Sequence, residues 1–520
     1  MAGLVMEIIK YLTLFMLGFM IYMIWLNLIR PLLYMNKYKK YSNVYMDSKF
    51  RFMMGELWHY AENMKNDRPF YYHLTQRSEE MKDKDLKLIF EGSVPVIEVI
   101  SPQAQKEFAG LQPHAVDRVG DLKGIGKIAP TSFPNNISDQ NFNKRRSTFM
   151  RLLSLNAASK HIPLMLDSIK NHLENWKVDQ KIFPKFAYEI NSLTFDIFTK
   201  ILFGNDIGPI MSTLRDFEAN DGTFIKLNFM DLFIHVVKDY VDGYYNPISS
   251  ILFFLNHYDL VNPFRRNKRN LHRFYQILNE AIDESKDQNS IFKQLITMPG
   301  FERNEIFMDL IFFMLAGTET TSHIIVGMLY NLKKYPHTYE KLIQALSESG
   351  FKKFDEVNEQ LFDKEKILKI DYLNYVVKEA LRIDNSAIET LYYVTTQPFR
   401  ICNVPVESGI RMKIDIFGAH YNINEWIEPT KFIPERFDPN SEYYLKPNST
   451  KRRNPYAHVP FSHGMRSCPG QTLALLEAKV IMAYLLMHTD YDIEEEQLQK
   501  SLGFAVGSEQ DLNIILKKIS

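Results

Sequence analysis

The segment PFSHGMRSCPG at Pro460–Gly470 places a cysteine between an arginine and a Pro-Gly pair, directly before a long apolar stretch. The chain has only two cysteines, which cannot build a disulfide framework or an all-cysteine zinc site. A thiolate at Cys468 is costly unless hydrogen-bond donors or a metal stabilise it. The helix expected to begin near Gln471 offers free backbone N–H groups and the positive end of its dipole.

The neighbours of Cys468 suit a flat cofactor that contains a metal. Gly464 permits a tight turn, and Gly470 lets a flat group approach the backbone closely. Arg466 can bind a carboxylate through charge-assisted hydrogen bonds, and Phe461 can shield the sulfur. These features describe a thiolate ligand to iron beside a clamp for a propionate. The alternative is a free cysteine that acts only as a small buried hydrophobic residue.

A second candidate site is the sequence AGTETT at positions 316–321, inside the apolar segment Glu305–Leu332. Gly317 would loosen the helix and admit oxygen or water to its backbone. Glu319 and Thr320 would then supply an acid and a hydroxyl group for proton transfer. The alternative is an ordinary helix whose threonine hydroxyls bond to carbonyls of the preceding turn.

Glu379 and Arg382 lie three residues apart in the expected helix Tyr372–Ile383, so both charges occupy one face of that helix. An exposed pair of this kind contributes little to stability. Downstream, the sequence PERF at positions 434–437 supplies a further arginine, Arg436.

These motifs together resemble the cytochrome P-450 family, and they occur in the family's order. The cysteine loop matches the family's haem-binding signature at every fixed position, namely Phe461, Gly464, Arg466, Cys468 and Gly470. The resemblance implies that Cys468 is the proximal ligand of haem b (iron protoporphyrin IX). It also implies that Glu319 and Thr320 deliver protons during the activation of dioxygen.

The same resemblance assigns the remaining charged motifs. Glu379, Arg382 and Arg436 are expected to form a buried structural network and not to take part in catalysis. The sequence FNKRR at 142–146 stands where many members carry Trp-x-x-x-Arg, whose arginine pairs with a haem propionate. Arg146 is therefore the expected propionate ligand; Arg145 is its rival, and a solvated basic helix face is the alternative.

Three departures from the family pattern concern the substrate side of the site and the propionate contacts. A phenylalanine replaces the tryptophan at position 142, and the segment IDNSAIET after Arg382 lacks the prolines common there. A frequent propionate-binding arginine is replaced near Tyr392 and Tyr393. The thiolate and oxygen-activation motifs are unaffected by these changes.

The N-terminus contains a candidate membrane anchor. Tyr11–Ile29 has 19 residues without a charge, enough for a helix of ~28 Å, close to the hydrocarbon thickness of a bilayer. The basic residues that follow predict a cytosolic position for the rest of the chain, namely Arg30, Lys37, Lys39 and Lys40. A cleaved signal peptide is the alternative, but no Ala-x-Ala-like site follows the apolar run.

We expect three parts: a transmembrane helix at 1–30, a basic juxtamembrane linker at 31–45, and one large haem-binding catalytic domain at 46–520. The predicted fold class is mainly α with small β-sheets, the cytochrome P-450 fold. Helical spacing of apolar residues predicts helices at Ala187–Leu202, Glu305–Leu332, Tyr372–Ile383 and Leu473–Met487. Strands are expected at Val94–Ile100, Thr390–Thr396 and Arg411–Phe417.

The expected function is a monooxygenase that inserts one oxygen atom from O2 into an apolar organic substrate. Lysine plus arginine equals aspartate plus glutamate at 62 each, which gives no basic excess for nucleic acid. Resemblance to anchored family members implies the endoplasmic reticulum membrane and electrons from NADPH–cytochrome P-450 reductase, with cytochrome b5 as a further candidate donor. The alternatives are an isomerase or dehydratase that needs no reductase, and a non-catalytic haem-binding membrane protein.

Basic residues before the cysteine loop, at Lys451–Arg453, are either a solvated face or a docking site for an acidic electron donor.

Overall fold

The computed structural model covers all 520 residues of the chain. The residues it describes are 2–47, 55–66, 78–118, 125–176, 182–183, 186–245, 262–355, 358–494 and 513–519.

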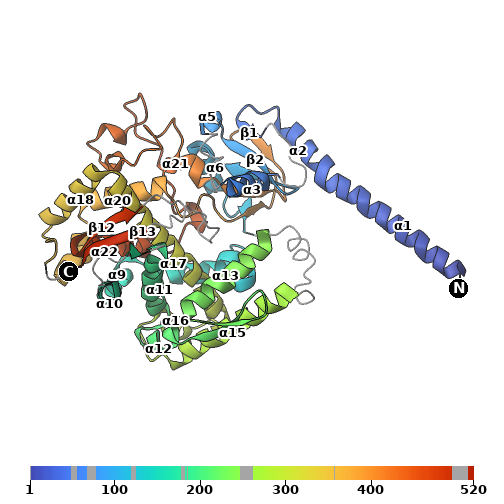
Figure 1. The fold of residues 1–520 in the computed structure, drawn as a ribbon. Coiled ribbons are helices and arrows are strands. Elements are labelled where there is room, and N and C mark those ends of the chain that lie inside the picture. The colour runs from blue at the N-terminus through green and yellow to red at the C-terminus, as the bar shows by residue number, and fades with distance from the viewer. Residues whose placement is uncertain are drawn as a thin grey trace.

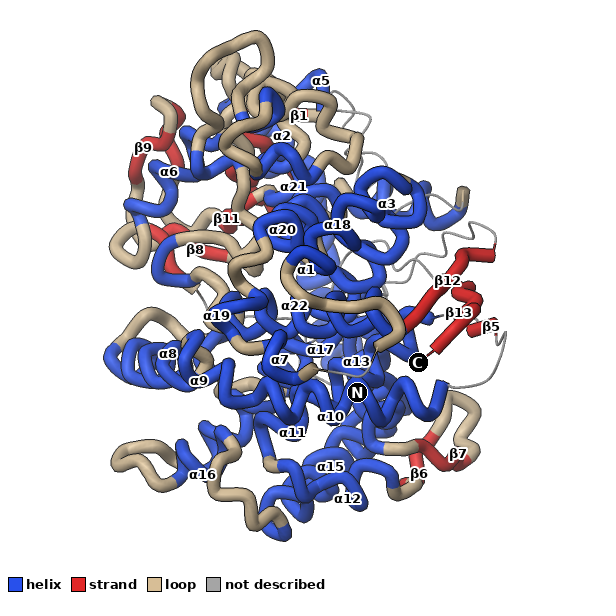
Figure 2. Tube along the Cα trace, turned by 90° about the vertical axis from the view of Figure 1, so that its left-hand side faces the viewer, coloured by secondary structure: helices blue, strands red, loops and turns tan. Residues whose placement is uncertain are grey.

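The predicted fold class is confirmed, because helices make up most of the described chain and the strands form small sheets (Figure 2). The four helices expected from apolar spacing are present with nearly the expected bounds. They are α11 (Phe186–Phe203), α17 (Arg303–Lys334), α20 (Asp371–Ile383) and α22 (Gln471–His488).

Helix α17 is the centre of the helical part of the molecule. Its side chains are buried on nearly every face between residues 306 and 332, as expected for a helix that is apolar all round. It packs along α11 and also contacts α20 and α22 (Figure 1). The cysteine loop immediately precedes α22, so these helices fix the position of that loop.

The largest sheet in the described part of the chain has six strands, which come from residues 44–117 and 393–414. Their order is β1 (Val44–Met46), β2 (Leu86–Glu91), β3 (Val94–Val99), β11 (Arg411–Ile414), β8 (Tyr393–Thr395) and β4 (Val116–Asp117). The sheet therefore brings the segment after α20 next to the N-terminal third of the chain. The described residues also form three smaller sheets, one of which joins β12 (Thr489–Glu494) to β13 (Asn513–Ile519) and β5 (Ile182–Phe183).

The expected strand Arg411–Phe417 is shorter in the structure, because a helix replaces its second half. Strand β11 ends at Ile414, and the short helix α21 (Ile416–His420) follows at once. The side chain of Asp415 caps that helix by accepting a hydrogen bond from the Gly418 N–H group at 2.6 Å. The alternating pattern of the sequence continues through this cap, so it suggested a longer strand.

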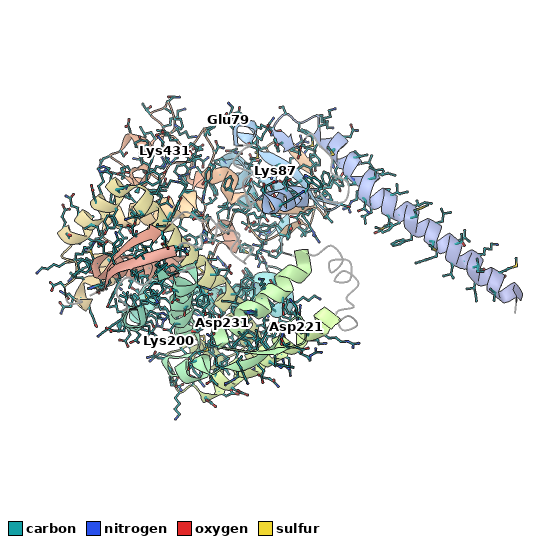
Figure 3. All side chains as sticks on the ribbon, in the orientation of Figure 1. Glu79, Lys87, Lys200, Asp221, Asp231 and Lys431 are labelled. Atoms are coloured by element: carbon teal, nitrogen blue, oxygen red, sulfur yellow. The ribbon has the colours of Figure 1, made fainter. Side chains whose placement is uncertain are left out.

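The N-terminal segment is helical well past the apolar stretch. Helix α1 (Ala2–Ile24), a π-helical turn η1 (Trp25–Ile29) and α2 (Arg30–Tyr38) follow one another directly. Helix α1 projects from the body of the molecule, with exposed apolar side chains along its length (Figures 1 and 3). Within the described part of the chain, two helices are long and apolar enough to cross a membrane, but α17 is mostly buried in the core, whereas the segment Val5–Tyr38 is not.

Residues 31–45, expected as a linker, have regular structure up to residue 38. Helix α2 contacts β2 and β3. Tyr38 at its end is fully buried, and its hydroxyl donates to the Pro405 carbonyl at 3.1 Å. Strand β1 then pairs with β2 from residue 44. The apolar surface of the six-stranded sheet explains this order, because Tyr38 and Val44 pack into the same core cluster.

The three residues of the expected charged network lie together in the structure. Arg382 donates from Nε and Nη2 to the two carboxylate oxygens of Glu379, both at 2.8 Å. Arg436 donates from Nε to Glu379 Oε1 at 3.1 Å. All three side chains are fully buried.

Backbone carbonyls accept the remaining hydrogen bonds that the two guanidinium groups donate. Arg382 donates to the carbonyls of His420, Pro429 and Lys431 at 3.0, 2.7 and 3.1 Å. Arg436 donates to the carbonyl of Glu428 at 2.7 Å. The network therefore connects α20 to the irregular chain between residues 420 and 437, which precedes the cysteine loop.

Arg382→Ala should lower the free energy of unfolding by about 3–5 kcal/mol and prevent haem incorporation, because Glu379 loses its two-point partner while buried. The partly exposed pair formed by Lys341 and Glu435 at 2.7 Å provides the control. Lys341→Ala should cost less than about 1 kcal/mol. Denaturant unfolding of the full-length protein in detergent measures both. An Arg382→Ala protein as stable as the control variant and fully loaded with haem would contradict the role of the network.

Candidate active site

A cavity of about 410 Å³ lies between the central helices and the cysteine loop. Helix α17 forms one wall, the loop around Cys468 and the start of α22 form another, and the segment 385–392 after α20 forms a third. Most of the cavity surface is apolar. The aromatic residues that line it include Phe133, Phe142, Phe198, Phe312, Phe313 and Phe461.

The cysteine loop has a defined backbone geometry. The Cys468 N–H group donates to the Phe461 carbonyl at 2.9 Å, which closes the loop on itself. Gly464 has φ +74°, a conformation that favours glycine, and a Cβ atom there would lie 3.0 Å from the Gln112 side chain. Gly470 is the N-terminal cap residue of α22.

The Cys468 thiol lines the cavity next to the start of α22. Burial raises its pKa, while the N–H groups of Gly470 and Gln471 and the charge of Arg146 act in the opposite direction without reversing the shift. A metal cation in front of the sulfur would supply the missing stabilisation. The geometry of the loop therefore suits a thiolate metal ligand.

Three arginines line the same cavity: Arg118, Arg146 and Arg466. Arg146, on α8 (Gln140–Leu152), donates to the Ser467 carbonyl at 2.9 Å and to its hydroxyl at 3.0 Å. It therefore lies against the residue that precedes the cysteine. Arg118 donates to the Tyr392 carbonyl at 2.8 Å.

Arg466 has spare hydrogen-bonding capacity. Its Nη2 donates to Asp117 Oδ1 at 2.9 Å and to the Asn136 carbonyl at 2.6 Å. Its Nε and Nη1 are buried without a partner among the described residues. The guanidinium carbon lies 3.7 Å from the centre of the Phe142 ring, which stands where the family often has tryptophan. Two unpaired donors at a cavity wall fit the carboxylate of a bound cofactor.

Arg145, the rival of Arg146, faces away from this cavity. Its Nε donates to Asp309 Oδ2 on α17 at 2.8 Å, and its Nη2 donates to the Thr131 carbonyl at 3.0 Å. Asp309 also accepts from the Phe133 N–H group at 2.7 Å. Burial raises the pKa of Asp309 to about 7, and Arg145 opposes that shift. This pair attaches the chain near Phe133, which forms part of the cavity wall, to α8 and α17.

The two residues of the oxygen-activation motif are placed differently. Thr320 lines the cavity, and its hydroxyl donates to the Ala316 carbonyl one turn earlier at 2.6 Å. The Thr320 carbonyl accepts from the Ser386 hydroxyl at 2.9 Å. Glu319 is partly buried and is not among the described residues that form the cavity wall.

Gly317 is required by packing between helices. A Cβ atom at this position would lie 2.6 Å from the ring of Phe198 on α11. Helix α17 continues without interruption through Gly317. The glycine thus lets α11 approach α17 closely, which is a different role from the loosening expected from the sequence.

Sequence reasoning missed three charged residues of the cavity wall: Arg118, Glu389 and Glu477. Glu477 is almost fully buried on α22, its Oε1 has no partner among the described residues, and burial raises its pKa to about 8. An acid inside the apolar run LALLEAKV was a visible signal for it. Arg118 and Glu389 occur in no motif, and only the folding of the chain brings them to the cavity.

The basic segment before the cysteine loop divides into two parts. Lys451 and Arg452 are exposed. Arg453 turns inward, donates to the Tyr443 carbonyl at 2.6 Å and lies 4.3 Å from the ring of Trp426. Only the first two residues remain available to a partner.

Comparisons with known proteins agree with this fold and site. A sequence model of the family described as Cytochrome P450 matches residues 34–514. Cytochrome P450 3A11 of Mus musculus is 24% identical over 463 residues, which covers 83% of this chain and 84% of the mouse protein. Cytochrome P450 3A17 of Cavia porcellus is 23% identical over 448 residues, with the same two coverages.

A shorter match is to Cytochrome P450 4F12 of Homo sapiens, 29% identical over 200 residues, or 38% of this chain and 36% of the human protein. The fold and the cysteine-lined cavity define a haem-thiolate protein. The chain belongs to the cytochrome P450 family, and its cofactor is haem b.

Gly317→Ala should destabilise the protein by about 1–3 kcal/mol, because the new methyl group overlaps the Phe198 ring. Gly110, inside helix α6 (Pro102–Leu111), serves as the control, because a Cβ atom added there would have no neighbouring atom within 4 Å. Gly110→Ala should be neutral or slightly stabilising. Thermal unfolding of the full-length protein measures both.

The double variant Gly317→Ala/Phe198→Leu tests the mechanism of this effect. Removing the ring should recover part of the loss caused by the alanine, since the two changes act on one contact. Strict additivity of the two single effects would show that Phe198 is not the reason for the glycine.

Proposed function

We propose that the protein is a membrane-anchored haem-thiolate monooxygenase that inserts one oxygen atom from O2 into an apolar organic substrate. The observation that carries the proposal is the Cys468 thiol at the wall of a mainly apolar cavity, with arginines beside it. The second oxygen atom leaves as water, and NADPH is the source of the two electrons. The match to the Cytochrome P450 model over residues 34–514 supports this reaction class.

When bound, haem b supplies the redox chemistry that activates dioxygen. Cys468 would hold its iron through the thiolate. Phe461, Gly464 and Gly470 would shape the loop that receives the ring, and Arg466 and Arg146 would bind the propionates. The two free donors of Arg466 support its role. Arg146 lies beside Ser467 and so reaches the same edge of the cavity.

Protons reach the cavity through the oxygen-activation motif. The Thr320 hydroxyl, which lines the cavity, orients a proton donor toward the reacting oxygen. Glu319, the adjacent acid, supplies protons from outside the cavity wall. The position of Thr320 favours a monooxygenase over an isomerase or dehydratase, since those reactions need no proton relay. Glu379, Arg382 and Arg436 act only by holding the fold around the loop.

Electrons come from a separate protein, NADPH–cytochrome P-450 reductase, with cytochrome b5 as a further donor. The exposed charges of Lys451 and Arg452, shortly before the cysteine loop, suit an acidic partner. The N-terminal helix anchors the protein in the endoplasmic reticulum membrane with a single pass. Basic residues after that helix favour a cytosolic position for the catalytic domain.

The absorption spectrum of the reduced, CO-bound protein tests the axial ligand. The wild-type protein should show the red-shifted Soret band of thiolate-ligated haem, and Cys468→Ala should abolish it. Cys402→Ala is the matched control, because Cys402 lies outside the cavity wall and burial raises its pKa to about 12. A band typical of histidine-ligated haem in the wild-type protein would refute the assignment.

Thr320→Ala should keep the CO-bound spectrum and raise peroxide formation several-fold per NADPH consumed, because the proton relay loses its hydroxyl group. Thr318→Ala is the control, since the Thr318 hydroxyl makes the equivalent bond to the Met314 carbonyl at 2.9 Å but does not line the cavity. The assay uses the full-length protein with reductase in vesicles and lauric acid, progesterone and 7-ethoxycoumarin as test substrates. Equal coupling in both variants would remove Thr320 from the relay.

A further inference from the structure

The six-stranded sheet carries a row of buried charges across its middle strands. Lys87 on β2 is paired in register with Glu98 on β3, and its Nζ lies 2.9 Å from a Glu98 carboxylate oxygen. Glu98 is in turn opposite Lys413 on β11. All three side chains are almost fully buried. Lys87 is labelled in Figure 3, in the part of the molecule that contains β1, β2 and α3 (Leu57–Lys65).

At one end of this row, the ammonium group of one lysine forms ion pairs with two carboxylates. The Nζ of Lys413 contacts Glu91 on β2 and lies 2.8 Å from Oε1 of Glu389. Glu91 is also bonded to the Tyr392 hydroxyl. Glu389 has only Lys413 as a side-chain partner among the described residues, through one of its two oxygens. The Glu389 carboxylate is therefore the less satisfied of the two.

Glu389 is also the member of the row that opens toward the cavity. Its side chain is 31% exposed, compared with 3% for Lys413 and 17% for Glu91. Glu389 lines the cavity together with its neighbours on the segment that follows α20, whereas Lys413 and Glu91 are not among the described wall residues. A ligand in the cavity can therefore reach the acid but not the lysine that it shares.

The charges around Glu389 favour a cation. Burial, together with Glu98 on β3 and Glu91 on β2, raises the pKa of Glu389 to about 7 against the opposing effect of Lys413 on β11. Asp415, bridged to Glu389 through the backbone, is a further buried acid whose pKa burial raises to about 7. A positive group beside Glu389 would relieve this excess of acidic side chains and would be desolvated together with its partner.

The other charged residues among the described residues of the cavity wall are Arg118, Arg146, Arg466 and Glu477. Arg118 donates to the Tyr392 carbonyl, and Glu477 lies on α22. Arg466 pairs with Asp117, and Arg146 bonds to Ser467. Under the proposed function these arginines also meet the two propionates of the haem. They are not among the groups that shift the pKa of Glu389.

We propose that Glu389 is a specificity residue, and that the substrate is a largely apolar molecule that carries a positively charged nitrogen bound at this carboxylate. This inference rests on the proposed function and names the class of its substrate. The apolar cavity wall would bind the body of the molecule, and Glu389 would fix the end that bears the charge. In this arrangement Lys413 limits the affinity for the cation but keeps the acid in place.

The test compares two probes of equal shape, (4-phenylbutyl)trimethylammonium and its carbon analogue (5,5-dimethylhexyl)benzene. The quaternary nitrogen has no lone pair, so it cannot bind iron and cannot mimic an amine inhibitor. Equilibrium dialysis against the haem-loaded, full-length protein in detergent gives both affinities without any turnover. Glu389→Gln should weaken binding of the cation about tenfold, as expected for loss of one partly desolvated ion pair, and leave the neutral probe within about twofold.

The pH dependence gives a second readout. Because the pKa of Glu389 lies near 7, its carboxylate is ionised at pH 8 and largely protonated at pH 6. The wild-type protein should therefore bind the cation more tightly at pH 8, and Glu389→Gln should bind it equally at both values. Glu389→Asp retains the charge and should retain the preference for the cation.

Two outcomes would overturn the proposal. An equal loss of affinity for both probes in the Glu389→Gln variant would show that the residue only supports the fold through Lys413. Unchanged binding of both probes would show that the carboxylate does not face the ligand. Neither result touches the CO-bound spectrum, so a failure of this inference is distinguishable from a failure of the proposed function.

Discussion

The cavity depends on the ion pairs that the buried carboxylate of Glu379 forms. It lies between two arginines, and those arginines donate their remaining hydrogen bonds to the backbone carbonyls of a long irregular segment. Between the end of α21 and the 3-10 helix at Pro434–Phe437 this segment is neither helix nor sheet, so its carbonyls have few backbone partners. The ion cluster therefore replaces secondary structure, and it fixes the chain that leads into the cysteine loop. A charge buried this deeply is tolerated because every donor around it is used.

The cavity itself combines two demands that usually conflict. An apolar substrate needs a dry pocket, and a thiolate in a dry pocket is unstable because burial raises the pKa of Cys468. The structure meets both demands by placing backbone N–H groups behind the sulfur and arginines at one edge. A metal bound at the sulfur would stabilise the thiolate, because burial acts against its charge.

The sequence was sufficient for the family, the fold class and the positions of four long helices, because apolar spacing and the cysteine loop are local patterns. It also identified Glu379, Arg382 and Arg436, although the contacts between them form only in the folded chain. The reason for Gly317 could not be read from the sequence, since its neighbour Phe198 lies on another helix. Glu389 was invisible for a similar reason: its partner Lys413 and the neighbouring acids Glu91 and Glu98 lie on β11, β2 and β3, which only the folded sheet brings to this residue.

The junction between the N-terminal helix and the sheet has a mechanical consequence. The helix runs without a break to Tyr38, whose ring is fully buried. Asn27 on the same helix accepts a hydrogen bond from Ser93 in the turn between β2 and β3. The N-terminal helix is therefore joined to the domain rigidly and not through a flexible linker. Adding one residue to this helix would rotate the whole domain by roughly 100° about the helix axis, relative to the start of the helix. The length of this helix thus sets the rotation of the domain relative to the apolar N-terminal segment.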